Sequence, residues 1–330
     1  MVMLLLDRVA ENLELEGRRP KKMILCLSGG LDSRVLFHLL CRLRRQFAFE
    51  LSVLHINYRL RGEDSNQDEV FVQQLCAEEN VPLVIHKASI DKEASIQEQA
   101  REERLKLSRS LDFDSDWIEA HHLDDQIETF FFRLLRGTGL SGLRPLKIVS
   151  YREGRWIWRP LLSVRKEALL DYANEEALAF RQDKTNLETL YSRNWIRLEL
   201  LKSIEEKYPH YTTSVSRLQD QIEEEHEWWC AEIPKIVDQI SDDESWDLEG
   251  LRLLPRAFRH RVLHEMIDKR WKLRWSREKI LELSRLIESK MDFNFNAPKN
   301  WVLRAAQKDG RIDLEAPPVA KNQGIPRLLV

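Results

Sequence analysis

The chain has 330 residues and a formal net charge of −3; 43% of its residues are hydrophobic and 32% are charged. This length predicts two or three domains with a sizeable core, and the small net charge alone does not indicate a nucleic-acid-binding protein. No apolar run approaches the length of a transmembrane helix, so we expect no membrane span. The four cysteines lack C-x-x-C and zinc-site spacing, which indicates reduced thiols in a cytoplasmic protein.

The N-terminal part is predicted to run helix, strand, glycine turn and helix. Apolar Met1 to Leu6, followed at once by acidic residues, indicates an amphipathic helix rather than a signal peptide. Met23 to Leu27 has the length of a buried strand, and apolar residues recur at helical spacing from Val35 onward. The turn between them, Ser28-Gly29-Gly30, points backbone N–H groups and a helix N-terminus at one place, which suits an anion. Its glycines let a phosphate approach without a Cβ in the way.

The side chains of this turn also fit a phosphate site. Ser28 and Ser33 add hydroxyl donors, and the carboxylate of Asp32 is explained if it binds Mg²⁺ or caps the helix. The pattern is neither a Walker loop nor G-x-G-x-x-G. The string Ser28-Gly29-Gly30-Leu31-Asp32-Ser33 instead resembles the pyrophosphate-binding loop of ATP pyrophosphatases, which split ATP into AMP and pyrophosphate. A capped turn without a ligand is the structural alternative.

Three further strands and an intervening helix continue the pattern. Leu51 to Ile56, Val81 to Ile85 and Trp117 to Ala120 are short apolar runs, and Asp64 to Glu79 has apolar residues at helical spacing. Strands that alternate with helices predict an α/β fold with a doubly wound parallel sheet. In such sheets the ligand lies beyond the carboxyl ends of the strands.

Polar clusters follow three of these predicted strands. They are Ser28 to Ser33 after the first, His55-Ile-Asn57 after the second, and His121-His122 after the fourth. Because the carboxyl ends of parallel strands share one edge, we expect these clusters to form one nucleotide-binding crevice.

The segment His121 to Thr129 enters a helix rich in carboxylates. Asp125 and Glu128 share one helix face, where they could hold Mg²⁺ or a cationic substrate. A helix N-cap followed by a solvated first turn is the structural alternative, since acids are common there, and zinc ranks last because no cysteine is nearby. We expect the buried stripe of this helix to consist of four residues, Ile127, Phe131, Leu134 and Leu135.

Local charge and pattern indicate a second domain. Arg133 to Lys166 has nine Lys or Arg and one acid, Gln219 to Glu249 twelve acids and one base, and Arg252 to Lys290 twelve bases and five acids. The basic runs are candidate phosphate contacts and the acidic run a solvated face. We predict domains at residues 1–205 and 206–330, the second mainly helical with a terminal β-hairpin or three-stranded piece. Trp271 and Trp275 are four residues apart and could stack on bases, but this spacing is more typical of core residues, which we favour.

Several longer motifs resemble the tRNA(Ile)-lysidine synthetase family across roughly residues 20 to 217. The match is carried by His121 to Thr129, Leu135 to Leu143, His55 to Asn57, Ala100 to Arg104, Arg159 to Leu162, Asp183 to Asn186, and Tyr191 to Arg197. This resemblance implies an adenine nucleotide alpha hydrolase-like fold. It also implies an enzyme that adenylates the wobble cytidine of tRNA(Ile) with a CAU anticodon and then ligates free lysine to carbon 2, giving lysidine.

The same resemblance assigns roles to particular residues. The loop residues Ser28 to Ser33, with His55 and Asn57, would bind ATP, and Asp32 would hold Mg²⁺. Lysine would be held by Arg101, Asp125 and Glu128, with Asp32, Asp125 and Glu128 as the catalytic residues. Independently of the resemblance, we predict that Arg193 and Arg197 contact tRNA or pyrophosphate, because two arginines in one helical turn repel each other without an anion. A structural capping network that joins the two domains is the alternative.

The chain departs from the family pattern at Arg34, Tyr58 and Trp195, and it resembles the short form without an extra C-terminal domain. The oligomeric state is left open, with a homodimer as one option. A tRNA thiolase is the main alternative, although the absence of paired cysteines argues against it. An amidating ligase should lack the basic run from Arg133, and a non-catalytic tRNA-binding module should not retain the loop and carboxylates.

Overall fold

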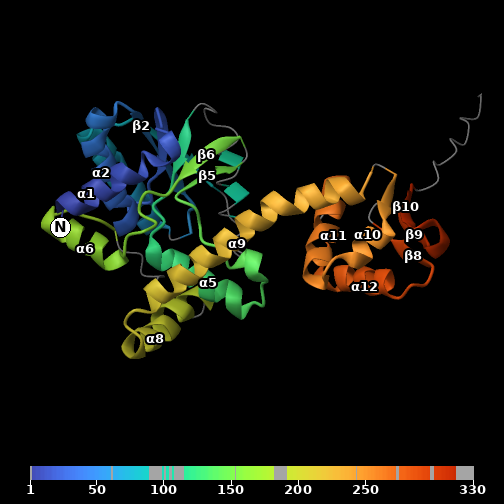
Figure 1. Cartoon of the computed structure of the whole chain (residues 1–330). Helices are drawn as coiled ribbons and strands as arrows, with labels where there is room; N and C mark the ends of the chain where they lie inside the picture. Colours follow the sequence, from blue (N-terminus) through green and yellow to red (C-terminus); the bar gives the residue numbers. More distant parts are fainter. Residues whose placement is uncertain are drawn as a thin grey trace, which may run out of the picture. The chain divides into compact units, whose positions relative to one another are not determined.

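The computed structural model describes residues 2–60, 62–88, 99, 102–103, 106–107, 115–152, 154–181, 192–242, 244–272, 275–297 and 301–316. The chain forms two compact units, Met1–Glu223 and Glu224–Val330, which we call unit 1 and unit 2 (Figure 1). Among the described residues, no helix combines the length and the apolar character needed to cross a membrane.

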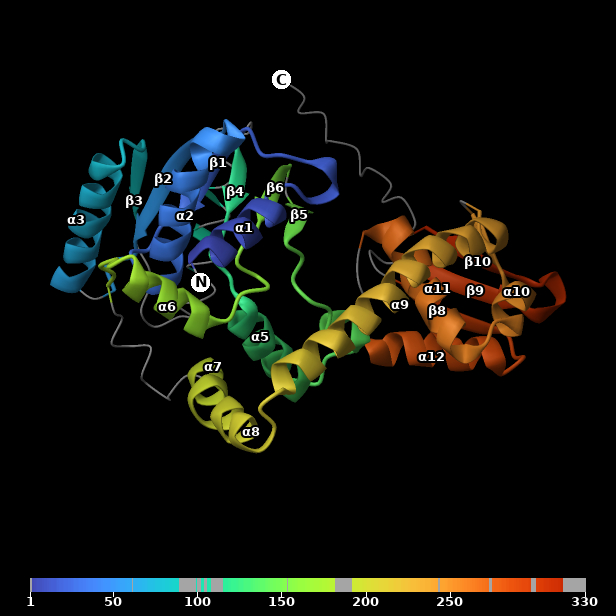
Figure 2. The ribbon, with the colours of Figure 1, turned by 60° about the vertical axis from the view of Figure 1, so that its left-hand side comes forward.

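Unit 1 is built on a six-stranded sheet with the order β3-β2-β1-β4-β6-β5 (Figure 2). All neighbouring strands pair in parallel except β5, which pairs antiparallel with β6 at the edge. The strands are β1 (Lys22–Cys26), β2 (Glu50–Asn57), β3 (Leu83–Lys87), β4 (Asp116–Ile118), β5 (Val149–Arg152) and β6 (Arg155–Trp158). The predicted doubly wound α/β sheet is confirmed, and each of its four predicted strands is present.

Helices cover this sheet and extend from its carboxyl edge. Helices α1, α2 and α6 lie together on one face (Figure 2), where the largest core cluster includes Leu36, Trp158 and Tyr172. The helical segments of unit 1 are α1 (Val2–Asn12), η1 (Leu15–Gly17), α2 (Leu31–Phe47), α3 (Glu63–Glu78), α5 (Leu123–Leu135), η2 (Leu140–Gly142), α6 (Lys166–Glu175), α7 (Ser192–Trp195), η4 (Ile196–Leu200), α8 (Leu201–Lys207) and the first part of α9 (Tyr211–Ile240).

The predicted buried stripe of α5 is only half right. Ile127 is fully buried and Phe131 is partly buried, but Leu134 and Leu135 have 45% and 61% of their surface exposed. The first turns of α5 pack against Ile196, Leu201 and Tyr211, in η4, at the start of α8 and at the start of α9. The last turn extends past these partners, so its leucines face solvent.

Unit 1 continues past the predicted boundary between residues 205 and 206. The first turns of α9 are tied to the segment after η2, because Gln219 donates a 3.0 Å hydrogen bond to the carbonyl of Leu143. Glu223 accepts two hydrogen bonds from Arg144 and contacts Lys147 at 2.9 Å. These contacts explain why the compact unit ends at Glu223 rather than at the change in sequence character.

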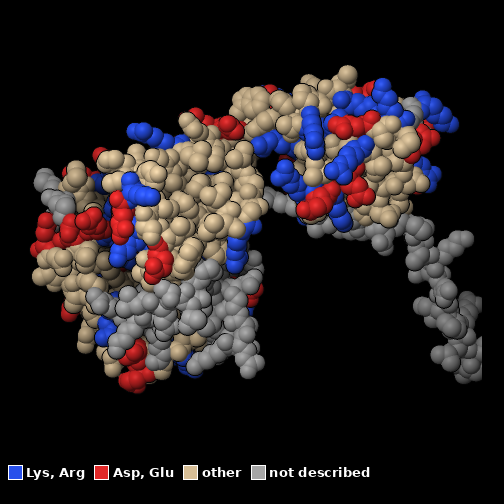
Figure 3. All heavy atoms as spheres, turned by 90° about the horizontal axis from the view of Figure 1, so that it is seen from below, with Lys and Arg blue, Asp and Glu red and all other residues tan. Residues whose placement is uncertain are grey.

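Unit 2 packs helices on a four-stranded antiparallel sheet with the order β7-β10-β9-β8. Its elements are the remainder of α9, then β7 (Ser245–Asp247), α10 (Leu248–Leu253), α11 (Arg256–Trp271), α12 (Arg277–Glu288), β8 (Phe293–Asn296), β9 (Val302–Ala306), η6 (Gln307–Asp309) and β10 (Arg311–Glu315). The terminal strands are confirmed, but the sequence did not predict β7. Trp271 and Trp275 are buried in the core, as predicted. In Figure 3, Lys and Arg alternate with Asp and Glu on the visible face of this unit.

Candidate active site

The turn between β1 and α2 is closed by its own serines. The Ser28 and Ser33 hydroxyls lie 2.9 Å apart, and the Ser33 hydroxyl also donates to the carbonyl of Gly30 at 3.1 Å. The backbone N–H of Gly30 donates to Ser28 Oγ at 3.3 Å. Since Ser33 is buried within α2, this small network fixes the shape of the turn without a ligand.

The two glycines of the turn differ. Gly29 has φ +86°, and a Cβ there would lie 3.3 Å from the ring of Phe71, so both conformation and space require glycine. The carbonyl of Gly29 also accepts a 2.9 Å hydrogen bond from the backbone N–H of Arg181, whose guanidinium contacts Asp68 at 2.8 Å. Gly30 has φ −70°, and among the described residues a Cβ there would meet only Ser28 Oγ, at 3.5 Å. The space in front of Gly30 is therefore open for a ligand.

The N-terminus of α2 begins at this open position. Gly30 is its N-cap residue and supplies no side chain to the first N–H groups of the helix. These groups have no partner within the helix either, so together with the helix dipole they favour an anion in front of Gly30.

Asp32, in the first turn of α2, faces two groups from other elements. Its Oδ2 lies 3.6 Å from Nε2 of His122 and 3.9 Å from Nζ of Lys166. Burial acts to raise the pKa of Asp32, but His122, Lys166 and Arg197 outweigh it, so the pKa lies below its usual value. Among the described residues, the buried Oδ1 of Asp32 has no hydrogen-bond partner. Asp32 is thus a carboxylate with one oxygen left for a ligand.

Helix α5 begins with a complete capping box. The Nδ1 of His122 accepts from the backbone N–H of Asp125, and Oδ2 of Asp125 accepts from the backbone N–H of His122 at 3.0 Å. Although burial lowers it, the pKa of His122 lies above its usual value because Asp32, Asp125 and Asp124 surround the ring. The predicted helix-capping alternative for this segment is therefore correct for Asp125, which can serve a ligand as well.

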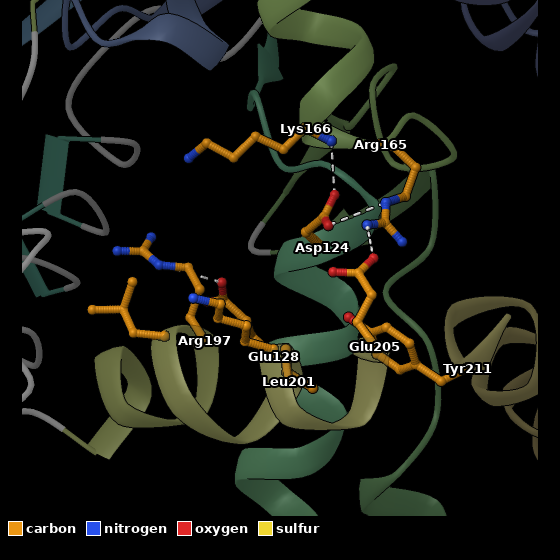
Figure 4. Close-up of a pocket in the computed structure, with 10 residues that line it drawn as sticks. Asp124, Glu128, Arg165, Lys166, Arg197, Leu201, Glu205 and Tyr211 are labelled. Carbon is orange, nitrogen blue, oxygen red and sulfur yellow. Dashed lines mark hydrogen bonds and ion pairs between the residues drawn. The ribbon is translucent and has the colours of Figure 1, made fainter. Parts of the chain in front are cut away.

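A pocket of about 270 Å³ opens beside these carboxylates (Figure 4). It is formed where the N-termini of α5 and α6 meet η4, α8 and the start of α9, all within unit 1. Acids, bases and apolar side chains mix in its wall, which is lined by Asp124, Glu128, Arg165, Lys166, Arg197, Leu198, Leu201, Lys202, Glu205 and Tyr211.

Ion pairs hold one wall of this pocket in place. Asp124 accepts a 2.7 Å hydrogen bond from the backbone N–H of Lys166 and lies 3.3 Å from Nε of Arg165. Arg165 in turn contacts Glu205 at 3.0 Å. These contacts join α5, α6 and α8, so the geometry of the pocket depends on the packing of three helices.

Glu128 is the carboxylate of the pocket whose ionisation is most altered. Burial and the charge of Asp125 raise the pKa of Glu128 to about 7, despite Arg197, whose Nε lies 3.8 Å from Glu128 Oε1. Arg197 lies in η4, a π-helical turn, and such turns are frequent at functional sites. A carboxylate that titrates near neutral pH can both bind a cation and accept a proton.

Other residues that the sequence singled out have internal partners. Nδ1 of His55 lies 2.8 Å from the carbonyl of Leu27, and the Asn57 amide donates to Glu69 at 2.8 Å. Both side chains are buried below the crevice, and their predicted contacts to ATP stay a prediction. The guanidinium of Arg193 lies 5.2 Å from the centre of the Phe132 ring. Arg101 and the motif around Asp183 to Asn186 lie outside the described residues.

Several residues of the site were not among the predicted site residues, and His122, Lys166 and Arg181 are the three that contact the turn or Asp32. His122 belonged to a motif but received no role, Lys166 appeared only as the end of a basic run, and Arg181 received no mention. His122 could have been recognised from the sequence as a candidate N-cap, because it directly precedes an acidic first helical turn. The contact between Arg181 and Gly29 joins distant parts of the chain and leaves no local pattern.

The amino-acid sequence of the chain is similar to those of several known proteins. The chain is 33% identical over 215 residues to the tRNA(Ile)-lysidine synthase of Haemophilus ducreyi, covering 65% of this chain and 49% of that protein. It is 37% identical over 222 residues to the tRNA(Ile)-lysidine synthase of Clostridium perfringens, covering 64% and 46%. The resemblance predicted from the motifs is confirmed, although the chain spans only about half the length of these relatives.

A solved structure and a family match define the fold. The U34-tRNA thiolase NcsA from Methanococcus maripaludis superimposes with a TM-score of 0.54 at 18% identity, covering 67% of this chain and 78% of that one. At this identity the likeness concerns the fold alone. Residues 5–204, which contain the glycine turn and most of the pocket, match the PP-loop domain family. With this match over more than half of its length, the chain belongs to the PP-loop family of ATP-binding domains.

Proposed function

We propose that this protein is a tRNA(Ile)-lysidine synthetase. It would use ATP to activate carbon 2 of the wobble cytidine in tRNA(Ile) with a CAU anticodon, and would then join the ε-amine of free lysine to that carbon. The single observation that carries the proposal is the position of a pocket lined by Asp124 and Glu128 directly beside the uncapped N-terminus of α2. Lys166 links the two, since it lines the pocket and lies 3.9 Å from Asp32.

The glycine turn suits the first half of this reaction. The 2-oxygen of the cytidine would attack the α-phosphorus of ATP, and pyrophosphate would leave. The open N-terminus of α2 would stabilise the negative charge of the departing pyrophosphate, because its N–H groups need no reorganisation. Adenylation makes the oxygen a good leaving group, and the nucleophile then replaces AMP at carbon 2.

The pocket suits the second half. Free lysine carries two ammonium groups and one carboxylate, and the lining offers both acidic and basic partners. Glu128 in the pocket wall would hold the attacking amine together with Asp125, which lies one turn earlier in α5 and outside the lining. The amine must lose a proton before it can react. With a pKa of about 7, Glu128 can accept that proton near neutral pH. Arg197 and the predicted Arg101 would face anionic groups of the substrates.

Mg²⁺ would accompany ATP at this site. Among the described residues there is no group of three or more acidic, histidine or cysteine side chains that could bind a metal on its own. Mg²⁺ often uses only one or two carboxylates together with substrate phosphates, and the unpartnered Oδ1 of Asp32 fits that requirement. When bound, the ion neutralises phosphate charge.

The cysteines do not support a thiolase. Burial raises the pKa of the Cys41 thiol to about 12 and that of Cys76 to about 11, so neither is a ready nucleophile. Cys26 lies within β1 and Cys230 lies in unit 2. We therefore favour an amine over a sulfur compound as the nucleophile. We expect the protein to be cytoplasmic, and we leave its oligomeric state undecided.

The test is the mass of the wobble nucleoside after incubation with ATP, Mg²⁺, lysine and tRNA(Ile) transcript. Lysidine should form only when all components are present, with one pyrophosphate released per nucleoside. A tRNA(Met) transcript, which has the same anticodon, is the matched control. Formation of a thiolated nucleoside when sulfide replaces lysine in the mixture, or pyrophosphate release that needs neither tRNA nor lysine, would contradict the proposal.

A further inference from the structure

The end of α5 presents an unusual surface. Leu134, Leu135 and Leu140 have 45%, 61% and 53% of their surface exposed, and Arg136 between them is also exposed. We call residues 134–142 the α5–η2 loop. These leucines contribute nothing to the core, so their exposure needs another explanation.

This loop is fixed in shape although it is exposed. Arg133 donates a 3.0 Å hydrogen bond to the carbonyl of Gly142, which closes the loop on its own stem. Gly137 has φ +78°, a conformation that favours glycine, and a Cβ on Gly142 would lie only 1.9 Å from Oγ1 of Thr138. A loop built this tightly presents its exposed side chains in one arrangement, which reduces the entropic cost of binding a partner.

The charge around the loop selects the kind of partner. Residues 133–147 contain four Lys or Arg and no acid. The guanidinium of Arg136 lies 4.2 Å from the centre of the Phe132 ring, and Arg193 approaches the same ring at 5.2 Å. Arginines held over an aromatic ring are well placed to contact phosphates, while neighbouring leucines offer apolar surface to bases.

The loop is also continuous with the pocket. Helix α5 carries Asp124 and Glu128 near its start and the loop at its end, so Leu135 lies about 16 Å along the axis from Asp124 and about 10 Å from Glu128. Arg193 lies in α7, which leads directly into η4 and the pocket residue Arg197. A nucleic acid that places one nucleotide at the pocket can reach the loop with its neighbours.

We propose that the α5–η2 loop is a docking surface for unpaired nucleotides of an RNA. The inference rests on the proposed function, in which these nucleotides flank the modified cytidine. Leu135 and Leu140 contact base faces, which are accessible only where the RNA is unpaired, and Arg136 contacts a phosphate. This surface is distinct from the phosphate-binding turn and from the lysine pocket.

The test measures RNA affinity of the full chain by fluorescence anisotropy, with a labelled CAU stem-loop and a fully paired duplex as probes. Arg136→Glu should weaken stem-loop binding about tenfold and lower the salt dependence by about one counterion. The double variant Leu135→Ala and Leu140→Ala should weaken stem-loop binding several-fold, leaving the salt dependence and duplex binding unchanged. Arg45→Glu is the matched control, because Arg45 is exposed in the last turn of α2 at the opposite edge of the sheet.

The outcomes separate this inference from the proposed function. If the wild-type protein makes lysidine but the loop variants bind the stem-loop like the wild type, the docking surface is wrong and the function stands. If the double leucine variant weakens duplex and stem-loop equally, recognition of unpaired bases is wrong. If the wild-type protein makes no lysidine, but the loop variants bind the stem-loop more weakly than the wild type does, the docking surface stands and the proposed function is wrong.

Discussion

Two of the helices that begin at the carboxyl edge of the unit 1 sheet, α2 and α5, differ in how their N-termini are capped. Helix α2 begins at Gly30 and receives no side-chain cap. Helix α5 begins at His122 with a reciprocal capping box that involves Asp125. Both ends carry the same partial positive charge, so the difference lies in what the sequence places there. The N-terminal N–H groups of α2 are available to a bound anion, whereas the N-terminus of α5 is capped by side chains of its own first turn.

The consequence is a division of charge within one crevice. The open end of α2 accepts phosphate, and the closed end of α5 can carry carboxylates without attracting a phosphate of its own. Asp32 and His122, 3.6 Å apart, join the two ends. The crevice can therefore hold an anionic cofactor and a cationic substrate a short distance apart, which the proposed reaction requires.

The largest effect on activity should come from a substitution that blocks the uncapped N-terminus of α2. Gly30→Val places a branched side chain where the phosphate approaches, and we expect pyrophosphate release to fall about 100-fold or more. Melting should change little, because Gly30 has φ −70° and a Cβ would meet only Ser28 Oγ in the part of the chain that the structure describes. Pyrophosphate release and thermal melting are both measured.

Gly29→Ala is the matched control for that variant. Gly29 has φ +86° and close contact with Phe71, so alanine there is strained and should melt early. Normal pyrophosphate release by Gly30→Val would remove the phosphate assignment from this turn. Equal melting of both variants would show that the two glycines do not differ as argued.

This contrast also marks how far sequence reasoning reaches. The strand, glycine turn and helix around Gly30 were predicted because each follows from a local pattern of the chain. The exposure of Leu134 and Leu135 was not predicted. Helical periodicity identifies the apolar face of a helix, but not how far along that face the neighbouring helices extend. The pairing of Arg181 with Gly29 depends on the final packing of distant segments, which no local pattern encodes.

The second largest effect concerns the carboxylates of α5. Glu128→Gln keeps shape but removes the charge that would hold the lysine amine, so kcat/KM for lysine should fall about 30-fold at pH 8. In the wild type this constant should rise about tenfold per pH unit up to about pH 7, because Glu128 is protonated below that value. Tyr211→Phe, which keeps the pocket wall, is a control. A flat pH profile would contradict the role of Glu128.

The same substitution should improve stability. Because the pKa of Glu128 is raised to about 7, its contribution to folding is fully present below its unfolded value and is lost as pH rises through 7. At pH 8 the free energy of unfolding of Glu128→Gln should therefore exceed that of the wild type by about 3 kcal/mol, and near pH 4 the two should be equal. Loss of stability at pH 8 would mean that the ion pair with Arg197 outweighs burial.

The smallest effect tests whether Asp125 is a cap, a substrate contact or both. Asp125→Asn still accepts from the backbone N–H of His122, so stability should change by only a few tenths of a kcal/mol. Asp125→Ala removes the acceptor and should cost about 1 kcal/mol. If Asp125 binds the amine, both variants lose lysine use equally although only one loses stability.

Because the charge of Asp125 helps to raise the pKa of Glu128, Asp125→Asn should also move the pH midpoint of lysine use below 7. Unchanged lysine use in Asp125→Asn, with loss only in Asp125→Ala, would show that Asp125 serves the helix alone.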